Sequence, residues 1–129
     1  MDSAVLFISP YLQDAQALGS MLAEASVVLT HATCLKDAVA RLDSAPFPVV
    51  LTEANLEDGT WRDVLSLTRS RDAELIVTDA WADARFWAEA INLGAYDLLA
   101  QPFQAAEVRR VLSSATSRRK GAMTGRATP

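Results

Sequence analysis

The chain has 129 residues, half of them apolar, and a formal net charge of −4, which is the composition of one soluble globular domain. All sixteen acidic residues lie at or before Glu107, so residues 1–116 carry a net charge of −8 and should not attract nucleic-acid phosphates. Cys34 is the only cysteine, which excludes an intrachain disulfide and a cysteine-based metal cluster.

Strand and helix signals alternate from the start of the chain. An apolar run at residues 4–8 predicts a strand. Ser9-Pro10 then matches the N-cap and the first position of a helix that extends to about residue 24. A second short strand is predicted at residues 27–30, followed by a helix that starts near residue 35 and ends before Pro46.

The middle of the chain repeats this alternation. Residues 49–52 predict the third strand, and residues 61–69 have the apolar spacing of a helix. The fourth strand is predicted at residues 75–78. A helix at residues 84–93 is closed by Gly94, a residue suited to the left-handed cap at the end of a helix.

The last predicted strand and helix are residues 96–100 and 105–114. Five continuous apolar strands that alternate with five helices indicate a parallel sheet buried on both faces, the α/β doubly wound architecture. We therefore expect one domain over residues 1–116. Residues 117–129 are small, polar and basic, and we expect them to form a disordered tail or linker.

Two segments at strand ends carry the most specific signal. Residues 53–59 read EANLEDG, which resembles the DxxLPDG loop of response-regulator receiver domains, the CheY-like family. Residues 94–103 read GAYDLLAQPF, which resembles the family's GAxDYLxKPF segment. The resemblance implies a five-stranded parallel sheet with strand order 2-1-3-4-5, as in the flavodoxin-like class. It also implies signalling in a two-component phosphorelay system, and a cis peptide bond before Pro102.

The resemblance also shows which chemical groups have been exchanged. In the family, an acidic pair holds Mg²⁺, an aspartate accepts the phosphoryl group, and a hydroxyl residue and a lysine complete the site. The corresponding positions here are Ser9 and Pro10, Glu53, Asp79 (with Thr78 one residue away) and Gln101.

These exchanges predict that the site does not accept a phosphoryl group. Ser9 and Pro10 offer no carboxylate for Mg²⁺, and Gln101 cannot neutralise a phosphoryl group as a lysine would. Glu53 is either a longer carboxylate that imitates a phosphorylated aspartate or a solvated strand-end carboxylate. We expect no enzyme activity, no cofactor, no bound Mg²⁺ and no other metal, although Glu53 and Asp79 together are a possible alternative pair of metal ligands.

Function through protein–protein contacts is therefore the first expectation, and two alternatives stay open. One is a working phosphoacceptor with an atypical site. The other is a small-ligand sensor that uses the pocket at the strand ends. Independently of these alternatives, Trp61 and Trp81 are expected near the loops at the strand ends, as caps on the vacated pocket. Glu57 and Asp58 are interpreted as turn residues, and His31 as an edge or loop histidine.

An apolar patch is predicted where receiver-like proteins usually contact partners. Trp87, Ile91 and Leu98 belong to the helix at residues 84–93 and the strand that follows it. With the last helix, these elements form the expected face for a protein partner or for self-association. The alternative is that Trp87 lies flat over the edge of the core. An output domain in a longer parent protein would follow the basic tail.

The N-terminus favours a cytoplasmic protein. It lacks the basic segment of a signal peptide and soon meets Pro10. No apolar run approaches the ~20 residues of a membrane helix. We expect no contact with a membrane or with nucleic acid.

Overall fold

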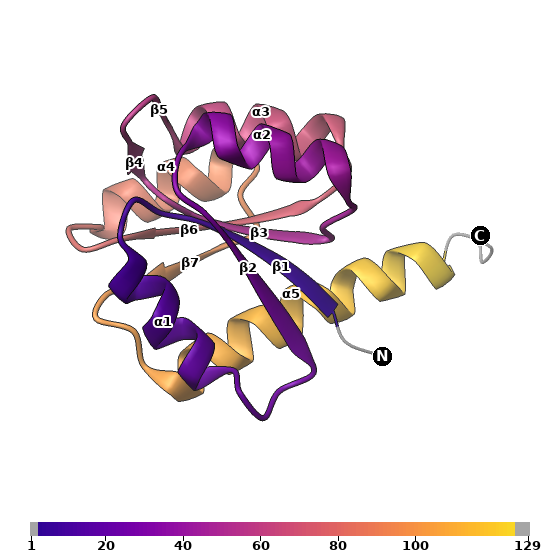
Figure 1. Ribbon diagram of the computed structural model, residues 1–129. Coiled ribbons are helices and arrows are strands. Elements are labelled where there is room, and N and C mark those ends of the chain that lie inside the picture. Colours follow the sequence, from indigo (N-terminus) through magenta and orange to yellow (C-terminus); the bar gives the residue numbers. More distant parts are fainter. Residues whose placement is uncertain (1–2, 126–129) are drawn as a thin grey trace.

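The computed structural model describes residues 3–125, and side chains for residues 3–118. The strands of its main sheet are β1 (Ser3–Ile8), β2 (Val27–Ala32), β3 (Val49–Glu53), β6 (Glu74–Asp79) and β7 (Asp97–Ala100). All neighbouring pairs are parallel, in the order β2-β1-β3-β6-β7 (Figure 1). Counted along the chain, this is the predicted order 2-1-3-4-5, which is therefore confirmed.

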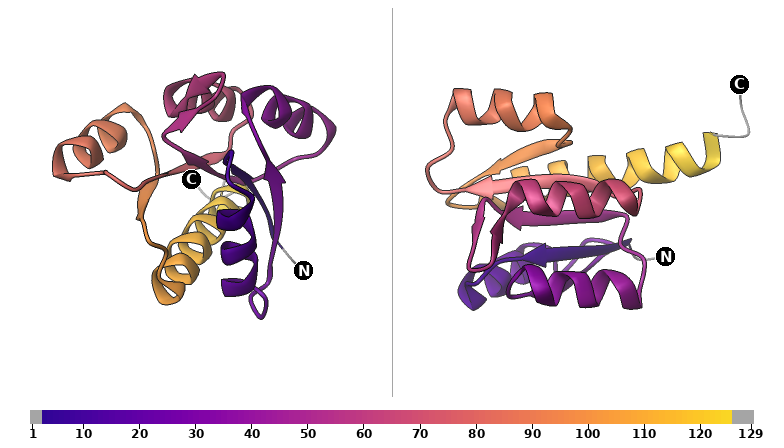
Figure 2. Two further views of the ribbon diagram at one scale, coloured as in Figure 1. Left: turned by 60° about the vertical axis from the view of Figure 1, so that its left-hand side comes forward. Right: turned by 90° about the horizontal axis from the view of Figure 1, so that it is seen from above.

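Helices cover both faces of this sheet. They are α1 (Leu12–Met21), α2 (Leu35–Ser44), α3 (Trp61–Ser70), α4 (Ala84–Leu93) and α5 (Ala105–Gly125). Helices α1 and α5 lie on one face, and α2, α3 and α4 lie on the other (Figures 1 and 2). The predicted doubly wound α/β architecture is confirmed. Within residues 3–125, no helix combines the length and the apolarity needed to cross a bilayer.

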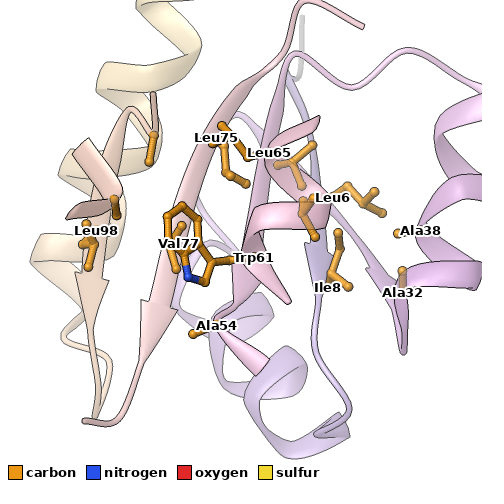
Figure 3. Packing of buried hydrophobic residues seen from close by; sticks show 14 of the residues in the cluster. Leu6, Ile8, Ala32, Ala38, Ala54, Trp61, Leu65, Leu75, Val77 and Leu98 are labelled. Atoms are coloured by element: carbon orange, nitrogen blue, oxygen red, sulfur yellow. The ribbon is translucent and has the colours of Figure 1, made fainter. Parts of the chain in front are cut away.

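The continuous apolar strands are explained by two cores. Successive side chains of a strand point to opposite faces, so a strand covered by helices on both faces buries all of them. In β1, Phe7 belongs to the cluster under α1 and α5, whereas Leu6 and Ile8 belong to the cluster under α2, α3 and α4. Figure 3 shows part of the second cluster, with the Trp61 indole among the aliphatic side chains of the sheet.

The start of α1 differs from the prediction. Ser9 and Pro10 are not its cap, because Ser9 still belongs to the sheet: its backbone N–H donates to the carbonyl of Ala32 at 2.9 Å. Tyr11 is the N-cap residue, and its N–H donates to the Ser9 hydroxyl oxygen at 3.1 Å. The Ser-Pro pair therefore forms the turn out of the strand, and the helix begins at Leu12.

The chain after β3 contains a hairpin that was not predicted. It consists of β4 (Asn55–Leu56) and β5 (Gly59–Thr60), with Glu57 and Asp58 as the turn residues that the sequence indicated. The Asp58 carboxylate accepts hydrogen bonds from the first two N–H groups of α2, at 2.8 Å and 3.0 Å. These bonds hold the pKa of Asp58 below its ordinary value. Asp58 thus caps a helix whose own N-cap residue makes no side-chain cap bond.

Helix α5 continues past its predicted end at residue 114. Ala115 and Thr116 are still buried against the sheet, and the Thr116 hydroxyl donates to the Leu112 carbonyl at 3.0 Å. The helix then runs through the segment for which disorder was expected, as far as Gly125, and extends beyond the sheet (Figure 2). Residues 126–129 lie outside the described residues. The division into a domain and a tail at residue 116 stays a prediction.

Gly94 ends α4 in the left-handed region, with φ of +122°. A Cβ atom there would also meet the Arg69 guanidinium at 2.6 Å. We expect Gly94→Ala to lower the free energy of unfolding by about 1–2 kcal/mol, measured by urea denaturation. Gly19→Ala is the matched control, because that helical position has open space around it and alanine should stabilise it by about 0.5–1 kcal/mol. Equal effects of the two substitutions would contradict the role of φ.

Candidate functional site at the strand ends

Three polar side chains meet at the carboxyl ends of β3, β6 and β7. The Gln101 amide nitrogen lies 3.0 Å from each oxygen of the Glu53 carboxyl group and 3.1 Å from the Thr78 hydroxyl oxygen. Because β6 lies between β3 and β7, the Gln101 side chain reaches across the end of β6 to Glu53. The peptide bond between Gln101 and Pro102 is cis, as the resemblance implied.

Thr78, rather than Asp79, supplies the hydroxyl group of this cluster. The parallel register pairs Glu53 with Thr78, which is fully buried. The Thr78 hydroxyl donates to the Leu99 carbonyl at 2.7 Å and accepts from Gln101. Asp79 is the last residue of β6 and lines the pocket beside the cluster. The assignment of Asp79 to the family's hydroxyl position stays a prediction, and Thr78 is the hydroxyl residue that contacts Gln101.

Glu53 is not the solvated carboxylate that one sequence interpretation described, since only 6% of it is exposed. Burial raises its pKa from an ordinary 4.5 to about 7. The hydrogen bond from Gln101 opposes this shift, because it stabilises the ionised carboxylate. The negative charges of Asp14 and Asp79 raise the pKa further, and Asp14 also accepts a hydrogen bond from the protonated carboxyl group.

Asp14 was missed in the sequence. It belongs to the first turn of α1. Its carboxylate lies within electrostatic range of Glu53. The only available signal was an acidic residue in the first turn of a helix, which is a common feature of helices with no relation to a site.

A pocket of about 230 Å³ opens next to the cluster. Trp81 lines it and is 88% exposed, and Tyr11 on the same pocket is also exposed. The complete lining is Tyr11, Glu53, Asn55, Asp79, Ala80, Trp81 and Gln101. The prediction that Trp61 caps this pocket is wrong, because Trp61 is 4% exposed and packs in the core under α3 and α4.

The residues at the end of β1 lack the carboxylate ligands of a Mg²⁺ site. Ser9 is fully buried, and its carbonyl accepts a hydrogen bond from His31 Nε2 at 2.8 Å. Neither Ser9 nor Pro10 has the carboxylate oxygen that Mg²⁺ prefers. Among the side chains that the structure describes, no three of His, Cys, Asp or Glu gather into a group that could hold a metal ion. His31 lies in the edge strand β2, as one sequence interpretation expected, and its ring stacks on the ring of Phe7 in β1.

The predicted apolar patch exists on α4 but is smaller than expected. Trp87 and Ile91 are 53% and 40% exposed, so both present apolar surface on α4. Leu98 is only 8% exposed and belongs to the core cluster under α4, so its place in the patch is wrong. A strand covered on both faces leaves no room for an exposed leucine in its middle.

Comparisons with known proteins identify the fold. No protein-family model matches the sequence, and no curated protein matches it. Solved receiver domains, however, superpose closely. A signal receiver domain from Vibrio parahaemolyticus has a TM-score of 0.87 and 18% sequence identity over 93% of this chain and 94% of its own.

Two other receiver domains show the same similarity. The receiver domain of an HD domain-containing protein from Pseudomonas fluorescens Pf-5 gives a TM-score of 0.84 with 21% identity, over 94% of this chain and 99% of its own. The beryllofluoride-activated NtrC4 receiver domain dimer gives 0.82 with 22% identity, over 90% of this chain and 98% of its own. The chain therefore has the CheY-like fold of response-regulator receiver domains.

Proposed function

We propose that this chain is a receiver-like signalling domain of a two-component system that acts through protein–protein contacts and without phosphorylation. The observation that carries the proposal is the bond between Gln101 and Glu53. A neutral amide occupies the place of the lysine that the resemblance implies, and it is engaged with a buried glutamate in place of the phosphoacceptor. A cytoplasmic location, expected from the sequence, is part of the same proposal.

Phosphoryl transfer needs a divalent cation and a cationic side chain to neutralise the charge that develops on the phosphoryl group. The carboxylates of Asp14 and Asp79 act on Glu53, and among the described side chains no Lys or Arg lines the pocket. An incoming phosphate dianion would therefore meet negative charge without compensation. We infer that the site neither binds Mg²⁺ for this chemistry nor accepts a phosphoryl group.

Incubation with acetyl phosphate and Mg²⁺ tests this proposal. We expect the intact mass of the protein to stay unchanged, whereas a conventional receiver domain treated in parallel should gain one phosphoryl group. We also expect no change in tryptophan fluorescence on titration with Mg²⁺. A phosphoryl adduct that disappears in Glu53→Gln would show instead a working phosphoacceptor with an atypical site.

The exposed α4 surface supports the contact part of the proposal. Trp87 and Ile91 lie one helical turn apart, and large exposed apolar side chains are typical of interface centres. One structural neighbour is a dimer of receiver domains and another comes from a protein with an HD domain. By analogy, we infer self-association or contact with an output domain through α4, β7 and α5.

Trp87→Ala tests this surface. Loss of a central tryptophan should weaken self-association about tenfold or more, measured by sedimentation equilibrium. Trp81→Ala is the matched control, because Trp81 is more exposed than Trp87 but lies at the strand-end pocket. An unchanged association constant for Trp87→Ala, or an equal loss for Trp81→Ala, would contradict the role of α4.

A further inference from the structure

We propose that the pocket at the strand ends binds a guanidinium group between the carboxylates of Glu53 and Asp79 and the aromatic side chains of Tyr11 and Trp81. This inference goes beyond the proposed function and does not depend on it. A negative result in the phosphorylation test would leave it standing, and a phosphoryl adduct would not support it.

The pocket is lined by the carboxyl groups of Glu53 and Asp79. Four ion pairs engage arginines elsewhere in the described side chains, and in them the carboxylates are Asp37, Asp43, Glu74 and Glu89. The carboxylates at the pocket, Glu53 and Asp79, have no arginine or lysine partner among the described side chains, and neither has Asp14. Carboxylates brought together without a cation raise the free energy of each other's ionised forms, so a bound cation is stabilising.

The carboxyl group of Glu53 has more acceptor positions than the Gln101 amide can fill. The amide nitrogen of Gln101 has two hydrogens but faces three acceptors, the two Glu53 oxygens and the Thr78 hydroxyl. An ionised carboxylate has about four acceptor positions. Glu53 is nine-tenths buried and lines the pocket, so its remaining acceptor positions are available to a donor that enters there.

The lining of the pocket favours a planar organic cation over a metal ion. Mg²⁺ requires several oxygen ligands in near-octahedral geometry, and the described side chains offer no group of three acidic or histidine ligands. A guanidinium group donates several hydrogen bonds in one plane and stacks on aromatic rings, which suits carboxylates beside Tyr11 and Trp81. The pocket of about 230 Å³ holds such a group with several waters, at about 30 Å³ for each water.

Protonation of Glu53 would oppose this binding. The groups that face Glu53 are Asp14 from α1, Asp79 from β6 and the neutral amide of Gln101 after β7, so no positive group among the described side chains holds it ionised. Its pKa of about 7 means that both forms are populated near neutral pH. Binding of a cation should therefore strengthen between pH 6 and pH 8.

The experiment is a titration of the whole chain with ethylguanidinium chloride, followed by NMR shifts of the Ala80 amide and the Trp81 amide and indole groups. We expect saturable shifts that are stronger at pH 8 than at pH 6, and weaker binding of ethylammonium and Mg²⁺. Glu53→Gln and Asp79→Asn should each weaken binding about tenfold, as expected for loss of one charged hydrogen-bond partner. Glu89→Gln is the matched control and should leave binding unchanged, because Glu89 pairs with Arg62 away from the pocket.

A parallel titration with N-acetyl-arginine N-methylamide separates two sources of the same group. Tighter binding than ethylguanidinium supports an arginine side chain of a protein, and equal binding supports a free small molecule. Shifts that do not saturate, binding that survives Glu53→Gln and Asp79→Asn, or tighter binding of Mg²⁺ would each overturn the proposal. The folded state of each variant is checked by the dispersion of the same spectra.

Discussion

Trp61→Ala is expected to lower the free energy of unfolding by about 3–5 kcal/mol, the largest effect of any substitution considered for this chain. Trp61 is 4% exposed and opens α3 (Figure 3). Its ring lies 5.8 Å from the ring of Phe86 on α4, and the Arg62 guanidinium lies 5.3 Å from the ring centre. Truncation therefore leaves a cavity where α3, α4 and the sheet meet.

Urea denaturation at neutral pH measures this effect, and the chain offers a control of the same residue type. Trp81 is 88% exposed, so Trp81→Ala should change the free energy of unfolding by no more than about 0.5 kcal/mol. The contrast between the two tryptophans separates burial from residue type. Similar losses for both variants would mean that Trp61 does not anchor the core.

Glu53→Gln is expected to raise the free energy of unfolding at pH 8 by roughly 2–3 kcal/mol and to leave it nearly unchanged at pH 5. The folded protein holds the Glu53 proton up to a pKa of about 7, whereas the unfolded chain releases it near 4.5. Between these values the folded state binds more protons, so stability falls as pH rises and stays low above pH 7. Glutamine removes the charge and keeps an oxygen that accepts from Gln101. Solvent in the adjoining pocket screens part of the Glu53 charge. The expected gain in the free energy of unfolding is therefore smaller than the full pKa shift of Glu53 would give.

Urea denaturation curves for wild type and variant at pH 5 and pH 8 measure this difference. The control is Glu89→Gln, which removes an exposed ion pair and should cost no more than about 1 kcal/mol at either pH. A Glu53→Gln variant that is less stable than wild type at pH 8 would mean that the Gln101 bond outweighs burial. In that case Glu53 would be ionised throughout the neutral range.

The fold was predictable because its signals are local and repeated. Each strand of the main sheet is an apolar run between turn residues, and Gly94 marked the end of α4 at the correct residue. The hairpin of β4 and β5 was not predictable, because two-residue strands carry no periodic signal. The end of α5 was missed because polar and basic residues without proline are compatible with either helix or disorder.

The positions of the site residues were predictable, but their environment was not. Glu53 and Gln101 were identified from strand ends, and they do meet there. The burial of Glu53, the approach of Asp14 and the contact of Gln101 with Thr78 depend on strand register and helix packing, which one sequence does not fix to a single residue. The predicted exposure of Leu98 was wrong for the same reason, because a shift of one position along a strand moves a side chain between the core and the surface.

The cap on α2 couples a helix to a hairpin more than twenty residues further along the chain. The N–H groups of Leu35 and Lys36 donate to Asp58, so the first turn of α2 is stabilised by the turn between β4 and β5. In the native protein, the exchange rates of those two amide hydrogens report opening of the hairpin, because release of Asp58 is what exposes them to water.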